Sequence, residues 1–148
     1  MSKILITRNS SLLLTPFFME REFFCKCADF NANSHLLDHQ LINAAQTIRE
    51  FAGSAVFITS SYRTPLCNSL SGGAKNSYHL KGMALDLHCP SGQAKINASI
   101  KKLGDLYLSL RKCGINGFGI AASFLHIDTR PSGLISDAVY GSYSLWFY

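Results

Sequence analysis

Residues 77–86 have the sequence SYHLKGMALD, and the other motifs of the chain can be placed around this stretch. It holds an imidazole, His79, and a carboxylate, Asp86, seven positions apart with Gly82 between them. Side chains seven apart on one straight strand would face opposite sides, so the backbone must bend for these two to meet. A glycine adopts such a bend easily. We therefore expect a turn at Gly82, followed by a buried strand over residues 83–88.

A second imidazole, His126, lies in residues 123–129, which have the pattern of a strand. Two His and one Asp form a donor set for a zinc ion that keeps one coordination position open for water or substrate. The alternation of a strand places Asp128 on the same face as His126, and His88 on the face of Asp86. Taken singly, His79 is better explained as a loop histidine and Asp86 as a paired structural carboxylate. A metal-free fold in which His79 and His126 are core residues is a further alternative.

These motifs resemble the zinc D-alanyl-D-alanine carboxypeptidase family (peptidase M15), whose fold is shared with the hedgehog signalling domain. The resemblance rests on Ser-x-His-x-x-Gly-x-Ala-x-Asp at 77–86, Ser-x-Tyr-Arg-Thr at 60–64 and Phe-x-His-x-Asp-x-Arg at 124–130. It covers residues 17–130 and is closest to the phage-associated branch. It implies an α+β fold with a central, mostly antiparallel sheet flanked by helices.

The resemblance also implies what the matching residues do. Zn2+ would be bound by His79, Asp86 and His126. Arg63 is expected in a catalytic and substrate-binding role, because its planar fork can hold a carboxylate or stabilise a developing oxyanion. Ser77 and Asn68 are expected beside the substrate. The cofactor prediction is therefore a single zinc site with polar groups around it.

One position departs from the best-known members of the family. They carry Glu or Asp three residues before the last His, where this chain has Ser123. A neutral hydroxyl cannot accept the proton of an attacking water. Asp128 is the best substitute as catalytic base. Its competing role is to orient His126 through the other N–H of the ring, and the sequence leaves both roles open.

The implied activity is hydrolysis of peptidoglycan stem peptides, by a D,D-carboxypeptidase or by an endopeptidase of the lysin type. Small members of this branch are common in phages, so the implied context is lysis or wall remodelling. Ser123 supports an alternative, a non-catalytic zinc-stabilised binding or virion-structural module of the same fold. A facial triad of a non-haem iron oxygenase is disfavoured, because no His follows His126.

Composition narrows the possible partners. The chain of 148 residues fits one domain, and its formal charge of +5 comes from scattered basic residues without the basic stripe of a nucleic-acid site. No apolar run approaches the roughly 20 residues that span a bilayer. Without a secretory signal, we expect cytoplasmic synthesis and action on the cell wall after release or export. We expect a monomer that binds peptidoglycan stem peptide.

The remaining segments give coarser predictions. Asn33-Ser34 reads as the N-cap of a helix that ends at Gly53, with His35 and His39 on its surface. A second helical pattern covers residues 91–112.

Residues 56–59 read as a central strand. The five cysteines show no repeated spacing and are expected to be reduced. Residues 1–16 form a poorly defined lead-in. Residues 131–148 are expected to form an aromatic closing strand or hairpin.

Overall fold

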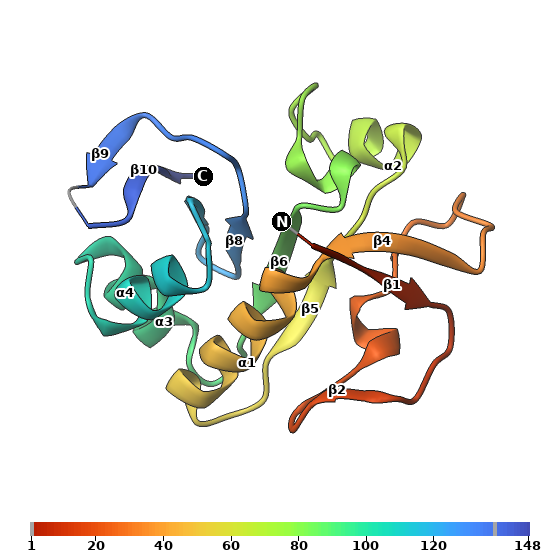
Figure 1. The fold of residues 1–148 in the computed structure, drawn as a ribbon, viewed down its shortest axis with the longest axis horizontal. Helices are drawn as coiled ribbons and strands as arrows, with labels where there is room; N and C mark the ends of the chain where they lie inside the picture. Colours follow the sequence, from red (N-terminus) through yellow and green to blue (C-terminus); the bar gives the residue numbers. More distant parts are fainter. Residues whose placement is uncertain (1, 138) are drawn as a thin grey trace.

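A computed structural model of the protein describes residues 2–137 and 139–148 (Figure 1). Met1 and Ala138, which belong to the predicted lead-in and closing segment, lie outside the described residues. The strands are β1 Lys3–Thr7, β2 Leu13–Thr15, β3 Phe18–Met19, β4 Ser34–Asp38, β5 Phe57–Ser60, β6 Ala84–His88, β7 Gly117–Ile120, β8 Leu125–Asp128, β9 Ile135–Asp137 and β10 Gly141–Phe147. The α-helices are α1 His39–Ala52, α2 Pro65–Leu70, α3 Gln93–Lys101 and α4 Asp105–Lys112, and the 3₁₀ helices are η1 Glu20–Phe23 and η2 Tyr78–Lys81.

The main sheet has six strands in the order β5-β6-β8-β7-β10-β9. Its neighbours pair antiparallel except β10 and β7, which are parallel. Two small antiparallel pairs, β1-β4 and β2-β3, stand beside it. The fold is therefore α+β with a central, mostly antiparallel sheet, as predicted. Among the described residues, no helix has the length and apolar character that a bilayer crossing requires.

One face of the sheet builds the hydrophobic core. Helix α1 contacts β6, α3 and α4, while α3 also contacts β7 and β8 (Figure 1). Alternate strand residues supply fully or almost fully buried side chains to the core: Leu85, Leu87, Phe118, Leu125 and Ile127. Because side chains alternate along a strand, the residues between these face the other side of the sheet.

That other face carries the polar residues in two transverse rows. The strand register aligns, across five strands, Ser60, Asp86, His126, Gly119 and Trp146. A parallel row consists of Ala84, Asp128, Gly117 and Ser144. Strand pairing thus places Asp86 directly beside His126, although 40 positions separate them in the sequence.

The predicted helix start at residues 33–34 is wrong. Residues 34–38 form strand β4, which pairs with β1, and the helix begins only at His39. Its C-terminal stop at Gly53 is confirmed, with a φ of 67°. The pairing with β1 is long-range and overrides the local helical spacing of the leucines. His35, predicted to lie on the surface, is buried and accepts a hydrogen bond from the backbone N–H of Cys25.

Two further element predictions need correction. Strand β5 is an edge strand of the six-stranded sheet, not a central one. Strand β5 pairs only with β6, and its side chains alternate between a half-exposed Phe57 and a buried Ile58. The pattern over residues 91–112 forms two helices, α3 and α4, rather than one. The break falls where Leu103 adopts a φ of 54° before Gly104, a conformation that a helix interior cannot contain.

The cysteines are not all reduced. Cys27 and Cys67 form a disulfide, with their Cα atoms 5.7 Å apart, while Cys25, Cys89 and Cys113 are free thiols. The hydroxyl of Thr64, the N-cap of α2, donates to the carboxylate of Asp29 and draws the two segments together. No sequence spacing reveals this pair, because the tertiary fold joins two cysteines 40 positions apart.

Candidate metal centre

His79 is positioned by the short 3₁₀ helix η2. The hydroxyl of Ser77 caps this helix by accepting from the backbone N–H of His79, and Gly82 ends it with a φ of 66°. A Cβ at Gly82 would lie 2.4 Å from the carbonyl oxygen of Leu36, so glycine is required for space as well as for conformation. The turn expected at Gly82 is confirmed, and it lets the His79 side chain return to strand β6.

Three donor atoms converge above the sheet. Nε2 of His79 lies 3.2 Å from Oδ1 of Asp86, and Nδ1 of His126 lies 2.9 Å from the same oxygen. The three ligand atoms all lie within 4.8 Å of one another. Their residues are only 2%, 7% and 5% exposed, in chain order. The structure therefore brings together the three residues that the sequence singled out.

Each imidazole has an inner nitrogen, which faces Asp86, and an outer nitrogen, which faces another partner. The partner of the outer nitrogen decides whether the inner one carries a hydrogen or a lone pair. Nδ1 of His79 faces the carbonyl oxygen of Ser61 at 2.7 Å, and Nε2 of His126 faces Oδ2 of Asp128 at 2.8 Å. Both partners can only accept, so both outer nitrogens carry the hydrogen. In neutral imidazoles the inner nitrogens then present lone pairs to the carboxylate of Asp86. Such a set of three lone pairs fits a cation, and two nitrogens with one carboxylate oxygen suit zinc.

A buried ion pair supports His126 from behind. The carboxylate of Asp128 is fully buried and accepts two hydrogen bonds of 2.7 Å from the Arg130 guanidinium. The backbone N–H of Arg130 adds a third at 3.1 Å. Gly117 leaves the room for this carboxylate, because a Cβ there would lie 2.1 Å from Oδ1 of Asp128. With His126 as fourth donor, every side of the carboxylate is occupied.

Arg63 is held at the other side of the centre. Its Nη2 donates to Oδ2 of Asp86 at 3.0 Å and its Nε donates to the hydroxyl of Ser60 at 2.8 Å. Its Nη1 has only a long contact, 3.4 Å, to the side-chain oxygen of Asn68. Arg63 therefore fixes the oxygen of Asp86 that faces away from the imidazoles, and Nη1 is its least committed donor.

The titrating groups reflect these contacts. Burial alone would raise the pKa of Asp86, but the contacts of its carboxylate with the imidazoles of His126 and His79 hold this pKa well below its usual range. Burial lowers the pKa of His79, which favours the neutral imidazole. Burial would also lower the pKa of His126, yet the carboxylates of Asp128 and Asp86 raise it.

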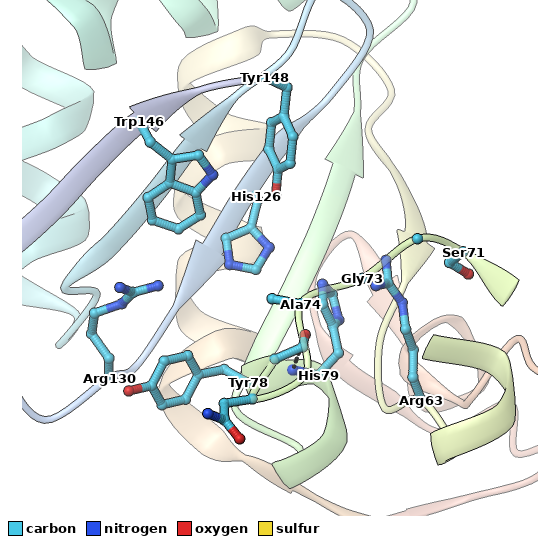
Figure 2. A pocket seen from close by; sticks show the side chains of 13 residues that line it. Arg63, Ser71, Gly73, Ala74, Tyr78, His79, His126, Arg130, Trp146 and Tyr148 are labelled. Carbon is cyan, nitrogen blue, oxygen red and sulfur yellow. Dashed lines mark hydrogen bonds between the residues drawn. The ribbon is translucent and has the colours of Figure 1, made fainter. Parts of the chain in front are cut away.

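The centre opens into a cavity of about 400 Å³ (Figure 2). Its lining consists of Arg63, residues 71–74, residues 76–79, His126, Arg130, Trp146 and Tyr148. The guanidinium of Arg130 lies 4.9 Å from the ring of Tyr78 and 4.8 Å from that of Trp146. The wall therefore combines aromatic rings with arginines, and among the described residues none of its side chains is acidic.

The other predicted site residues take different places. Ser77 lines the cavity as well as capping η2. Asn68 is buried, and its side-chain N–H donates to the carbonyl oxygen of Ala74, so it holds the cavity loop. Ser123 is exposed, and its carbonyl oxygen accepts from Nδ1 of His88. His88 thus flanks the centre, as expected.

Sequence reasoning did not assign Trp146, Tyr148 and Tyr78 to the site. The predicted closing hairpin is confirmed as β9 and β10. The rings could not be placed, because the parallel pairing of β10 with β7 has no local signature. The regular alternation of Trp146 and Tyr148 was the one available signal, since it puts both rings on one face of a strand.

Comparison with known protein families agrees with this geometry. The sequence model of the peptidase M15 family matches residues 16–128. This range includes all three candidate ligands, Arg63 and Asp128. The chain therefore belongs to the peptidase M15 family. This membership supports a peptidase, and so a hydrolase. A search of curated proteins found no match.

Proposed function

We propose that the protein is a zinc-dependent peptidase that hydrolyses amide bonds in the stem peptides of peptidoglycan, as a D,D-carboxypeptidase or as an endopeptidase. The observation that carries the proposal is the convergence of His79, Asp86 and His126 at the floor of the cavity. Family membership supports the peptidase class. The zinc ion and the cell-wall substrate are the proposed part, together with action at the wall after release or export.

A zinc ion held by these three side chains would polarise an amide carbonyl and make a water molecule more acidic. The chain's own residues organise what surrounds that chemistry. Arg63 keeps Asp86 oriented and presents Nη1 toward the cavity, where it can donate to a substrate carbonyl oxygen. Ser77 fixes the His79 turn at the cavity edge.

We assign Asp128 the role of orienting His126. A general base needs a free lone pair within reach of the attacking water. Asp128 is fully buried and accepts from His126 and from three N–H groups of Arg130. These contacts favour a positioning residue that fixes the tautomer of His126, with Nδ1 directed toward Asp86.

One observation favours the alternative of a non-catalytic zinc module. Ser123 stands where the best-known members of the family carry an acid, and among the described residues the cavity wall has no carboxylate. Such a module would bind the metal and hold peptidoglycan without cleaving it. Cleavage, rather than metal binding, therefore separates the two proposals.

The test offers cross-linked peptidoglycan to three samples of the purified protein: metal-free, zinc-loaded, and chelated then reloaded. We expect new amino groups only in the two zinc-containing samples. His126→Ala should release none, whereas His88→Ala, a matched histidine beside the centre, should behave as the unmodified protein. Zinc binding without any release of amines would favour the non-catalytic module. Equal release of amines by the metal-free and the zinc-loaded samples would contradict a zinc peptidase.

A further inference from the structure

The last strand brings side chains to the centre from beyond the matched family region, which ends at residue 128. Strand β10 runs parallel to β7, with Trp146 opposite Gly119. The backbone N–H of Tyr148 continues this pairing by donating to the carbonyl oxygen of Ile120 at 3.0 Å. Alternation then directs Trp146 and Tyr148 to the face that carries His126, and Phe147 to the opposite face.

Gly119 makes the space that these two rings occupy. A Cβ at this position would lie 2.8 Å from Cε2 of Trp146 and 2.8 Å from Cε2 of Tyr148. The ring of Phe124 also contacts the phenol, with its centroid 5.2 Å from that of Tyr148. Tyr148 therefore lines the cavity with one side of its ring against Gly119, while the residue as a whole stays 69% exposed.

Two tyrosines line the cavity, and they point differently (Figure 2). The hydroxyl of Tyr148 is directed toward the side of the cavity where His126 lies, whereas that of Tyr78 is directed toward Arg130 and away from His79. The indole of Trp146 lies beside the phenol, with the two ring centroids 6.3 Å apart. A phenol hydroxyl can donate its hydrogen to an acceptor in the cavity.

The two arginines of the cavity are partly committed. Arg130 donates Nε and Nη2 to Asp128, and Arg63 donates Nε to Ser60 and Nη2 to Asp86 while keeping Nη1 as its least committed donor. Partial burial of the phenol raises the pKa of Tyr148 above its ordinary value. The hydroxyl therefore stays protonated near neutral pH and remains a donor.

We propose that Tyr148 is a further catalytic residue, whose hydroxyl donates a hydrogen bond to the carbonyl oxygen of the scissile amide as negative charge develops there. The inference rests on the proposed peptidase function. In that reaction water adds to the carbonyl carbon, the C–N bond breaks, and one proton of the water ends on the leaving amine. Tyr148 keeps its own proton throughout and lowers the barrier through the hydrogen bond alone.

The experiment compares the zinc-loaded protein with Tyr148→Phe, which keeps the ring and removes only the hydroxyl. Loss of one oxyanion donor predicts a fall in kcat of about 100-fold, with KM nearly unchanged. A phosphinate analogue of the stem peptide, which carries a tetrahedral anionic centre, should lose affinity by a similar factor. Phe147→Leu, on the opposite face of the same strand, should leave kcat and phosphinate affinity unchanged, and zinc content should be equal in all three.

The two measurements, turnover and phosphinate affinity, test the role of Tyr148 and the proposed peptidase function separately. A zinc-loaded protein that cleaves nothing counts against the peptidase, while phosphinate binding is still measurable on it. Equal phosphinate affinity in the unmodified protein and in Tyr148→Phe overturns the inference, as does full kcat in Tyr148→Phe.

Discussion

At the scale of single residues, the centre depends on the hydrogen that each outer imidazole nitrogen carries. His126 donates to Asp128, and this contact directs Nδ1 toward Asp86. Asp128→Asn keeps the shape but removes the charge that fixes the tautomer. We expect zinc affinity to fall by about 10- to 100-fold, measured by competition with a chelating dye. Unchanged affinity combined with lost turnover would instead identify Asp128 as the catalytic base, and Ser123→Ala should change neither.

The same carboxylate gives a prediction for pH. Burial would raise the pKa of Asp128, but hydrogen bonds from Arg130 and His126 outweigh burial and lower it from 3.8 to about 2. Its folded-state pKa is thus depressed, so its stabilisation is complete above pH 4 and is lost as the pH falls from 4 toward 2. The contribution is on the order of 2 kcal/mol.

Denaturant unfolding of the zinc-free protein tests this prediction. The free energy of unfolding of Asp128→Asn should lie below that of the unmodified protein at pH 7, and the gap should narrow at pH 3. A gap of constant size would mean that the charge of Asp128 contributes nothing to stability.

The candidate metal ligands could be predicted from the sequence, but the aromatic residues that line the cavity beside them could not. His79, Asp86 and His126 could be predicted because the motifs that carry them, at residues 77–86 and 124–130, resemble those of a known family of zinc enzymes. Local properties also placed Asp128 beside His126. The aromatic wall could not be predicted, because Trp146 reaches the centre only through pairing with a strand 27 positions earlier, at Gly119.

At the scale of elements, strand β7 makes room for the site because two of its residues are glycines without side chains. Gly117 and Gly119 face the centre, one beneath Asp128 and the other beneath Trp146. Gly117→Ala would force the buried carboxylate away from His126 and Arg130. We expect a lower melting temperature and weaker zinc binding for this variant. Gly53→Ala, where a Cβ meets nothing within 4 Å, is a control for the effect of losing a glycine; it should lower stability without changing zinc affinity.

The disulfide between Cys27 and Cys67 attaches the segment after η1 to helix α2. Closing a loop of this length typically stabilises a folded protein by about 2–4 kcal/mol. Reduction, or the double variant Cys27→Ser with Cys67→Ser, should lower the free energy of unfolding by that amount. Thiol titration of the unfolded protein checks the pairing directly: three thiols are expected before reduction and five after it. Five thiols at the start would contradict it.

Elements were predicted where local pattern and tertiary pairing agree, and missed where they compete. The end of α1 at Gly53 is a local feature and was found. Its start was not, because residues 34–38 pair with β1 and the backbone N–H of Asp38 donates to the carbonyl oxygen of Gly82. These contacts join parts of the chain that no window of neighbouring residues contains.

At the scale of the whole molecule, the sheet separates two tasks. One face packs against α1, α3 and α4 to form the core, and the other holds the rows that contain Asp86, His126 and Asp128. A substitution on the core face can thus change stability without removing any group that contacts the three candidate ligands. A core variant such as Leu125→Ala should lower the free energy of unfolding by about 2–5 kcal/mol. Its zinc stoichiometry, measured below the melting temperature, should stay unchanged, whereas a loss of zinc would show that the faces are coupled.

The most direct test of the central claim is calorimetric titration of zinc into the metal-free protein, alongside His126→Ala and His88→Ala. We expect one zinc ion per chain in the unmodified protein and in His88→Ala, and no tight binding in His126→Ala. A protein that binds no zinc, or a His126→Ala variant that binds it as well as the unmodified chain, would contradict a metal centre formed by His79, Asp86 and His126.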